Sequence, residues 1–242
     1  MTELTYLRYE VLRTWRNRRF LLFSLAFPLI LFLAVAGPHK NVTIQGISFP
    51  LYYMTGMIAW GSMVAVISSG ARIAAERAVG WTRQLRITPL PTWSYFAAKI
   101  VCGYMMAILS MVVLFAAGSF VGVRLDAVQW LTMIGLLLVG LIPFSVMGIM
   151  FGHLLKLDSL GPAIGGVTSL FALLGGAYTP LVTSGFLFTL VKFLPSYWLV
   201  QAGKTTLRGG GWPLEGWLVI AVWTLVLSML AVRVYQRDTK RI

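Results

Sequence analysis

The stretch WLTMIGLLLVGLIPFSVMGIMF, residues 130–151, contains no charged side chain. An α-helix rises about 1.5 Å per residue, so a run of this length can cross the hydrocarbon core of a bilayer, which is about 30 Å thick. A surface helix of a water-soluble protein would interrupt such a run with polar residues on its exposed face. The stretch therefore predicts a membrane-spanning helix.

Further apolar runs lie on both sides of this stretch. They cover residues 20–36, 51–71, 96–121, 160–178 and 214–235. Of the 242 residues, 58% are hydrophobic and only 11% are charged, whereas a soluble domain carries about 25% charged residues. The sequence thus predicts a single all-α transmembrane domain, residues 1–242, with six transmembrane helices in the cell membrane.

The first apolar run has a second interpretation. It ends in Ala34-Val35-Ala36, a small-residue pattern typical of a signal-peptidase site. The polar segment before the run is longer than a usual signal-peptide n-region, which favours a first transmembrane helix.

Basic residues set the expected orientation, because cytoplasmic loops are enriched in Lys and Arg. Fifteen of the 20 Lys and Arg fall on one side of the predicted spans and five on the other. The richer side holds both termini and the segment between the second and third spans. We therefore expect both termini in the cytoplasm, as in a bacterial inner-membrane protein. The net charge of +13 comes from basic residues between the apolar spans, where they set the topology and face anionic lipid headgroups. A nucleic-acid-binding protein would instead cluster them on one solvated face.

Residues 1–19 are expected to form an amphipathic helix in the cytoplasmic membrane interface. Leu4, Leu7, Val11 and Trp15 fall on one helical stripe, although Arg8 interrupts it. An apolar stripe beside a basic face is typical of a helix that lies in the interface.

Residues 180–212 are expected to form a re-entrant or extracellular segment. The apolar piece 186–194 is bounded by Pro180 and Pro195. It would extend only about 13 Å as a helix, too short for a span. We expect re-entrant half-helices between the fifth and sixth spans.

The stretch QAGKTT, residues 201–206, resembles the end of a phosphate-binding P-loop. The P-loop pattern requires another glycine five positions before Gly203, and Trp198 stands there. The segment also lies on the predicted outer side, away from cytosolic ATP. We conclude that it is not a nucleotide site.

Catalytic and metal-binding groups are sparse. The acidic residues fall in predicted loops or at span ends, and His39 and His153 lie in predicted loops on opposite sides. Proton relays and membrane-embedded catalysis require ionisable groups inside the bundle. We therefore expect no catalytic site, cofactor or metal in this chain, and energy for any uphill transport must come from another subunit.

The segment AAERAVGWTRQLRITP, residues 74–89, can be interpreted simply as a basic loop next to the membrane. It also resembles the membrane subunits of ABC-2 type (type V) ABC exporters, whose loop between the second and third spans reads E-x-x-x-G-T-x-E-x-L-x-x-T-P. The matching positions are Glu76, Gly80, Leu85, Thr88 and Pro89. Trp81 stands where the family usually has Thr, and Arg83 stands where it usually has Glu.

The resemblance continues toward the C-terminus. Pro180, then Pro195-Ser196-Tyr197-Trp198, then residues 207–210 are similar to the family segment P…LP…Y…LR-G. The resemblance implies a homodimeric or heterodimeric permease bound to a separate ATPase subunit, which would hold ATP and Mg²⁺. It implies that residues 1–19 and the cytoplasmic coupling loop 72–95 receive that ATPase. It also implies an outer gate at Pro180, Pro195 and Tyr197.

The small number of polar groups in the spans favours a hydrophobic or amphipathic cargo, such as a drug or a lipid. A polysaccharide or glycolipid exporter is the alternative, because Trp60, Tyr104 and Tyr178 could stack on sugars. A structural or sensory membrane protein that transports nothing also fits the sequence.

Overall fold

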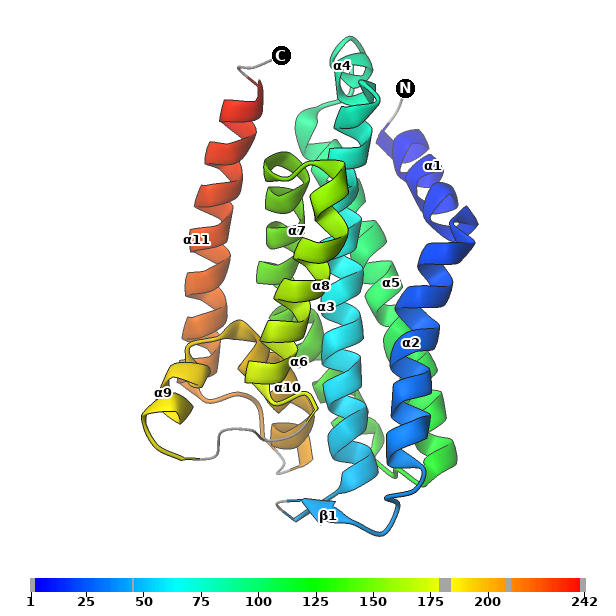
Figure 1. The fold of residues 1–242 in the computed structure, drawn as a ribbon, viewed down its shortest axis with the longest axis vertical. Helices are drawn as coiled ribbons and strands as arrows, with labels where there is room; N and C mark the ends of the chain where they lie inside the picture. The colour runs from blue at the N-terminus through cyan, green and yellow to red at the C-terminus, as the bar shows by residue number, and fades with distance from the viewer. Residues whose placement is uncertain (1–2, 45, 179–183, 208–209, 240–242) are drawn as a thin grey trace.

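The computed structural model describes residues 3–44, 46–178, 184–207 and 210–239. It is a bundle of mostly long helices with one short β-hairpin (Figure 1). The elements are α1 (Glu3–Arg16), α2 (Arg18–Ala36), β1 (Thr43–Ile44), β2 (Ile47–Ser48), α3 (Phe49–Ala78), α4 (Trp81–Arg86), α5 (Thr92–Val121), α6 (Ala127–Gly140), α7 (Ile142–Leu154), α8 (Leu157–Gly175), α9 (Phe186–Lys192), α10 (Pro195–Leu207) and α11 (Leu214–Thr239).

The bundle has two distinct ends (Figure 1). Helices α1 and α4 and the C-terminal part of α11 lie at one end, which we call the α4 end. The hairpin, in which Thr43 pairs with Ser48 and Ile44 with Ile47, lies at the other. Helices α9 and α10 are near it, and we call this the hairpin end. The prediction that both termini share one side of the bundle agrees with this arrangement.

Helix α3 is the central element of the bundle. It packs against α2, α5, α7, α8 and α10. Its side chains Met54, Met57, Ile58, Met63 and Ile67 are completely buried. The sequence gives α3 apolar residues on all sides, which is what a helix surrounded by other helices requires.

Helices α3 and α7 approach so closely that only glycine fits between them. A Cβ atom on Gly148 would lie 2.5 Å from the carbonyl oxygen of Ile67. A Cβ on Gly70 would lie 2.5 Å from the carbonyl carbon of Gly148, and one on Gly152 would lie 2.7 Å from the carbonyl oxygen of Gly70. Small residues allow such backbone contact between membrane helices, so α3 and α7 are rigidly packed near the α4 end.

The helices support the prediction of a membrane protein, and five of the predicted spans meet the length needed to cross a bilayer. These are α3, α5, α6 with α7, α8 and α11. The first predicted span lies in α2, whose shorter apolar part is Ser24–Ala36, so the count of six remains a prediction. The fourth span is broken at Leu141, between α6 and α7, and Pro143 occupies the first turn of α7.

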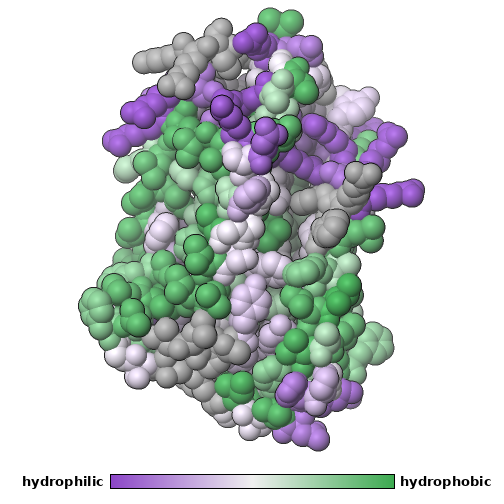
Figure 2. Space-filling model, in the orientation of Figure 1, coloured by the Kyte–Doolittle hydropathy of each residue, from purple (hydrophilic) through white to green (hydrophobic). Residues whose placement is uncertain are grey.

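On the face shown in Figure 2, hydrophobic side chains cover both flanks of the middle of the bundle, and we call this surface the apolar belt. Polar side chains gather mainly at the α4 end, with a smaller group at the hairpin end. Helix α11 contributes large exposed side chains to the belt, among them Leu218, Val222, Leu225 and Met229. A surface of this kind faces lipid or another membrane protein; the chain is a membrane protein.

The expectation of a loop over residues 72–95 is wrong. Helix α3 continues to Ala78, α4 occupies Trp81–Arg86, and α5 already begins at Thr92. Helix α3 extends past the apolar run 51–71 because its last turns are buried against α1, α5 and α7. The polar side chains of these turns find partners on those helices. Only two short connections, 79–80 and 87–91, are not helical.

Of residues 180–212, the structure describes 184–207 and 210–212, which include two short helices at the hairpin end, α9 and α10. Their re-entrant character stays a prediction. Helix α10 packs against α3, α6 and α8. QAGKTT lies within α10, and the ammonium group of Lys204 lies 4.2 Å from the centre of the Tyr52 ring. QAGKTT thus lies in the body of a helix and not in a loop that leaves a strand, and the absence of a nucleotide site in this chain stays a prediction.

We predict that the α4 end faces the cytoplasm. Single cysteines at Lys40, Arg124 and Arg83, all exposed, would be introduced in a Cys102→Ser background and treated with a membrane-impermeant thiol reagent. Positions 40 and 124, at the hairpin end, should react in intact cells, and position 83 should react only after permeabilisation. If only position 83 reacts in intact cells, the predicted orientation is wrong and the α4 end faces outward.

Candidate functional site

A buried group of charged side chains joins three helices at the α4 end. We call Glu10, Arg13, Glu76, Tyr95 and Lys99 the ionic cluster. The Lys99 ammonium group donates to Glu10 Oε1 at 2.6 Å and also to Glu76 Oε1. Arg13 Nη1 donates to Glu76 Oε1 at 2.6 Å, and the Tyr95 hydroxyl donates to Glu76 Oε2 at 2.6 Å. The cluster therefore connects α1, α3 and α5.

The cluster is dry at its centre. The side chains of Lys99, Glu76 and Glu10 are 0%, 1% and 5% exposed, while that of Arg13 is 54% exposed. Two cations face two carboxylates, so the formal charges cancel. Because an isolated buried charge is very costly, each member of the cluster depends on the others being in place.

The first helix docks through a polar face rather than through its predicted apolar stripe. Tyr6, Glu10 and Thr14, spaced four residues apart, are the buried residues of α1. Leu4 is 79% exposed and Trp15 is 48% exposed. The predicted stripe therefore points largely away from the bundle, and an interfacial position for α1 in the membrane stays a prediction.

Contacts of Thr14 and Tyr6 fix α1 further. Arg72 Nη1 donates to Thr14 Oγ1 at 2.7 Å. The rings of Tyr6 and Tyr95 lie 6.1 Å apart. Burial, followed by the nearby carboxylate of Glu10, raises the pKa of the Tyr6 phenol above its ordinary value. Tyr6 is therefore a neutral, packed side chain at physiological pH.

The five predicted coupling residues do not form one exposed surface. Glu76 is buried in α3, whereas Gly80 begins α4 with a φ of 72° and open space around its Cβ position. Thr88 Oγ1 donates to the Leu85 carbonyl at 2.6 Å and closes the turn after α4. Pro89 is exposed in the connection to α5. Their coupling role remains a prediction.

A small apolar core links α4 to the ionic cluster. Leu85 packs against a group of buried residues that consists of Tyr6, Ile73, Tyr95, Ala98 and Ile149. Tyr95 belongs both to this core and to the ionic cluster. The core and the Tyr95 hydroxyl thus connect α4 with Glu76 on α3.

The predicted gate residues are only partly described. Pro195 begins α10, and the Tyr197 ring contacts those of Trp198 and Phe188. Pro180 lies outside the described residues. The structure thus places Pro195 and Tyr197 at the hairpin end and leaves the gate itself a prediction.

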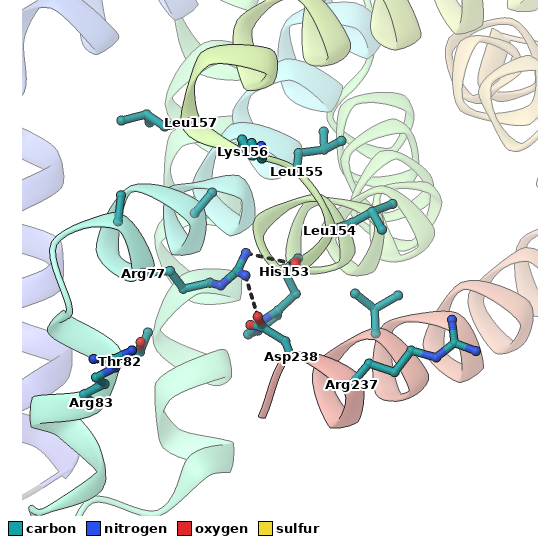
Figure 3. Close-up of a pocket in the computed structure, with 13 residues that line it drawn as sticks. Arg77, Thr82, Arg83, His153, Leu154, Leu155, Lys156, Leu157, Arg237 and Asp238 are labelled. Atoms are coloured by element: carbon teal, nitrogen blue, oxygen red, sulfur yellow. Dashed lines mark hydrogen bonds and ion pairs between the residues drawn. The ribbon is translucent and has the colours of Figure 1, made fainter. Parts of the chain in front are cut away.

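A second polar group lies on the other side of α3. Arg77 donates to the carbonyls of Gly152 at 3.2 Å and His153 at 2.9 Å, and it pairs with Asp238 (Figure 3). His153 Nδ1 lies 2.9 Å from the other Asp238 oxygen. His153 is thus buried at the end of α7, and its prediction as a loop residue is wrong. Within the described part of the chain, no group of three or more His, Cys, Asp or Glu could hold a metal.

The sequence does not by itself show that Lys99 and Glu10 meet beside Glu76. It groups Lys99 with the basic residues of the cytoplasmic side, and Glu10 with the acidic residues of loops and span ends. Two signals point to them. Lys99 is the single charge in the apolar run that continues to residue 121, and Tyr6, Glu10 and Thr14 repeat at a four-residue spacing.

Sequence comparison identifies the family. The pattern of the ABC-2 type transporter family matches residues 4–207. A protein of Bacillus subtilis (strain 168) named "Putative transport permease YvfS" is 27% identical over 227 residues, which are 92% of this chain and 92% of that protein. The chain belongs to the ABC-2 type transporter family.

We predict that Lys99→Met destabilises the protein, because it leaves two buried carboxylates with one partly exposed arginine. Loss of one partner from a buried ion pair costs about 3–5 kcal/mol. Thermal unfolding in detergent measures the change, with Lys40→Met, an exposed lysine at the hairpin end, as the control.

The triple variant Glu10→Gln, Glu76→Gln and Lys99→Met should recover part of the loss, because it removes the unpaired carboxylates together. If Lys99→Met unfolds at the same temperature as Lys40→Met, the ionic cluster does not stabilise the fold.

Proposed function

We propose that this chain is the permease subunit of an ATP-driven exporter that moves a hydrophobic or amphipathic cargo, a drug or a lipid, out of the cytoplasm or the inner leaflet. Its membership of the ABC-2 type transporter family carries this proposal. The small number of polar side chains in the spans supports a hydrophobic or amphipathic cargo.

The energy would come from a separate ATPase subunit, which holds ATP and Mg²⁺ and binds at the α4 end. Membership of the family implies an ABC ATPase as partner. A second copy of the permease, or a homologous permease, would complete the pathway across the membrane. The charge bias of the sequence supports a cytoplasmic position for the α4 end.

The ionic cluster is the proposed route of coupling. The ATPase would press on α4 when it binds ATP and closes. Leu85 would carry that motion to Tyr95, and Tyr95 would carry it to Glu76 on α3. Because α3 is packed by backbone contact on α7, the displacement would pass into the bundle as a rigid movement toward the hairpin end.

The aromatic residues considered for sugar stacking give little support to a polysaccharide. The Tyr104 hydroxyl donates to the Leu138 carbonyl at 2.9 Å, and the Trp60 ring contacts Phe27 and Tyr178. Contacts within the bundle therefore occupy these side chains. We therefore propose a lipid-soluble cargo. Polysaccharide export and a role without transport are the alternatives that the vesicle experiment below would detect.

We predict transport that follows ATP rather than an ion gradient. The chain and its ATPase partner would be reconstituted in vesicles with a fluorescent lipophilic dye as cargo and no pH or voltage gradient. Dye movement should require ATP and the partner. Movement driven by a proton gradient with the chain alone would rule out the proposal, and ATPase binding without any dye or lipid movement would favour the other roles.

We predict that Gly80→Val uncouples ATP hydrolysis from export. Valine at a φ of 72° is strained, although nothing lies within 4 Å of the added Cβ. The start of α4 must therefore shift, and export should fall about tenfold or more while ATP hydrolysis persists. Gly122→Val is the matched control, because Gly122 has a φ of 101° and open space at the hairpin end.

Both activities would be measured in the same vesicles, with assembly checked by co-purification. If the two variants export equally well, α4 does not take part in coupling.

A further inference from the structure

A cavity of about 610 Å³ opens at the α4 end, beside the end of α3 (Figure 3). It is enclosed by the end of α3, the start of α4, the connection between α7 and α8, and the end of α11. We call it the basic cavity because four cationic side chains line it: Arg77, Arg83, Lys156 and Arg237.

Among the described residues, one of these cations has an acidic partner. Arg77 pairs with Asp238, which also lines the cavity. The other oxygen of Asp238 is bound to His153, so each oxygen of this carboxylate already has a partner. Among the residues that the structure describes, Arg83, Lys156 and Arg237 form no ion pair. Three positive charges therefore share this cavity without compensation.

The rim of the basic cavity is apolar as well as cationic. Leu154 is 57% exposed and Leu157 is 50% exposed, and they lie on either side of Lys156 in the sequence. Below them, α8 and α11 expose further large apolar side chains, among them Leu170, Leu173, Met229 and Leu230. The cavity thus lies where the charged end of the bundle meets the apolar belt.

A helix terminus adds to the positive potential. Helix α8 begins at Leu157, which lines the cavity, and Lys156 precedes it as the N-cap. The first amide groups of a helix have no partner within the helix and attract anions. Asp158, in the first turn of α8, does not line the cavity.

We propose that the basic cavity binds the phosphate headgroup of an anionic phospholipid, whose acyl chains lie along α8 and α11. Basic pockets between transmembrane helices on the cytoplasmic side suit such headgroups. An acidic segment of a protein partner would match the charges but would leave the exposed leucines of the rim unexplained. A free phosphate would leave them unexplained in the same way.

The bound lipid is distinct from the cargo. It would hold the ends of α3, α7 and α11 together, because residues at the ends of these helices line the cavity. This role needs the α4 end to lie at the membrane interface but does not depend on transport or on the cargo.

The test is native mass spectrometry of the purified chain, titrated with phosphatidylglycerol or with phosphatidylcholine. The double variant Lys156→Gln, Arg237→Gln removes two exposed cations of the cavity. The matched control is Arg233→Gln, Lys192→Gln, which removes the same charge outside the cavity. Arg233 lies on α11 four residues before Arg237. A single variant, Arg83→Gln, provides a third site on α4.

We expect the wild type to prefer phosphatidylglycerol. Each removed cation should weaken its retention about fivefold, and the double variant about 25-fold, whereas the control should change little. Equal retention of phosphatidylglycerol by the double variant and the control would overturn the proposal. Millimolar inorganic phosphate that displaces the lipid completely would reassign the cavity to free anions.

The ATPase partner provides the remaining arm of the test. If the double variant keeps phosphatidylglycerol but no longer co-purifies with the ATPase, the cavity is a protein-docking site and the lipid proposal is wrong. Loss of lipid retention with normal ATPase binding supports the lipid proposal even if the transport proposal fails.

Discussion

The Lys99 ammonium group is the constraint on which the α4 end depends. A buried cation must be paired, and Lys99 finds its partners on two other helices, Glu10 on α1 and Glu76 on α3. The first helix is thereby held against the bundle by charge as well as by the packing of Tyr6. This explains why the buried face of α1 carries Glu10 and Thr14 while Leu4 points outward. A helix held in this way is specific in position, because a shift of one residue would separate the charges.

Two neighbouring residues at the end of α3 serve different sides of the bundle. Glu76 faces α1 and α5 in the ionic cluster, and Arg77 faces α7 and α11 beside the basic cavity. Successive residues of a helix point about 100° apart, so one helix end can organise two polar sites. The connection to α4 follows directly after these residues. Any force applied to α4 would therefore act on both sites, which relates the proposed coupling route to the proposed lipid site.

The centre of the bundle is suited to transmit such a force. Gly70, Gly148 and Gly152 bring the backbones of α3 and α7 into contact near the α4 end. Closely packed interiors move as units, because there is little free volume to absorb a displacement. At the hairpin end, the short helices α9 and α10 complete the wall, and α10 packs on α3 directly. Helix α3 therefore links the end where energy would enter to the end where cargo would leave.

The sequence by itself determined the class and the general arrangement. Apolar run lengths predicted the membrane helices, the motif around Glu76, Gly80 and Pro89 indicated the family, and Trp198 excluded a P-loop at Lys204. The sequence could not show that Glu76 lies in a helix. The length of an apolar run is measured from hydrophobic residues alone, so it ends before polar residues that are buried by pairing with one another. The partners of Glu76 lie 63 and 23 positions away in the chain, and only the packing of α1, α3 and α5 brings them together. The tertiary structure likewise decided which cations remain unpaired around the basic cavity, because pairing depends on distance in space and not on order in the sequence.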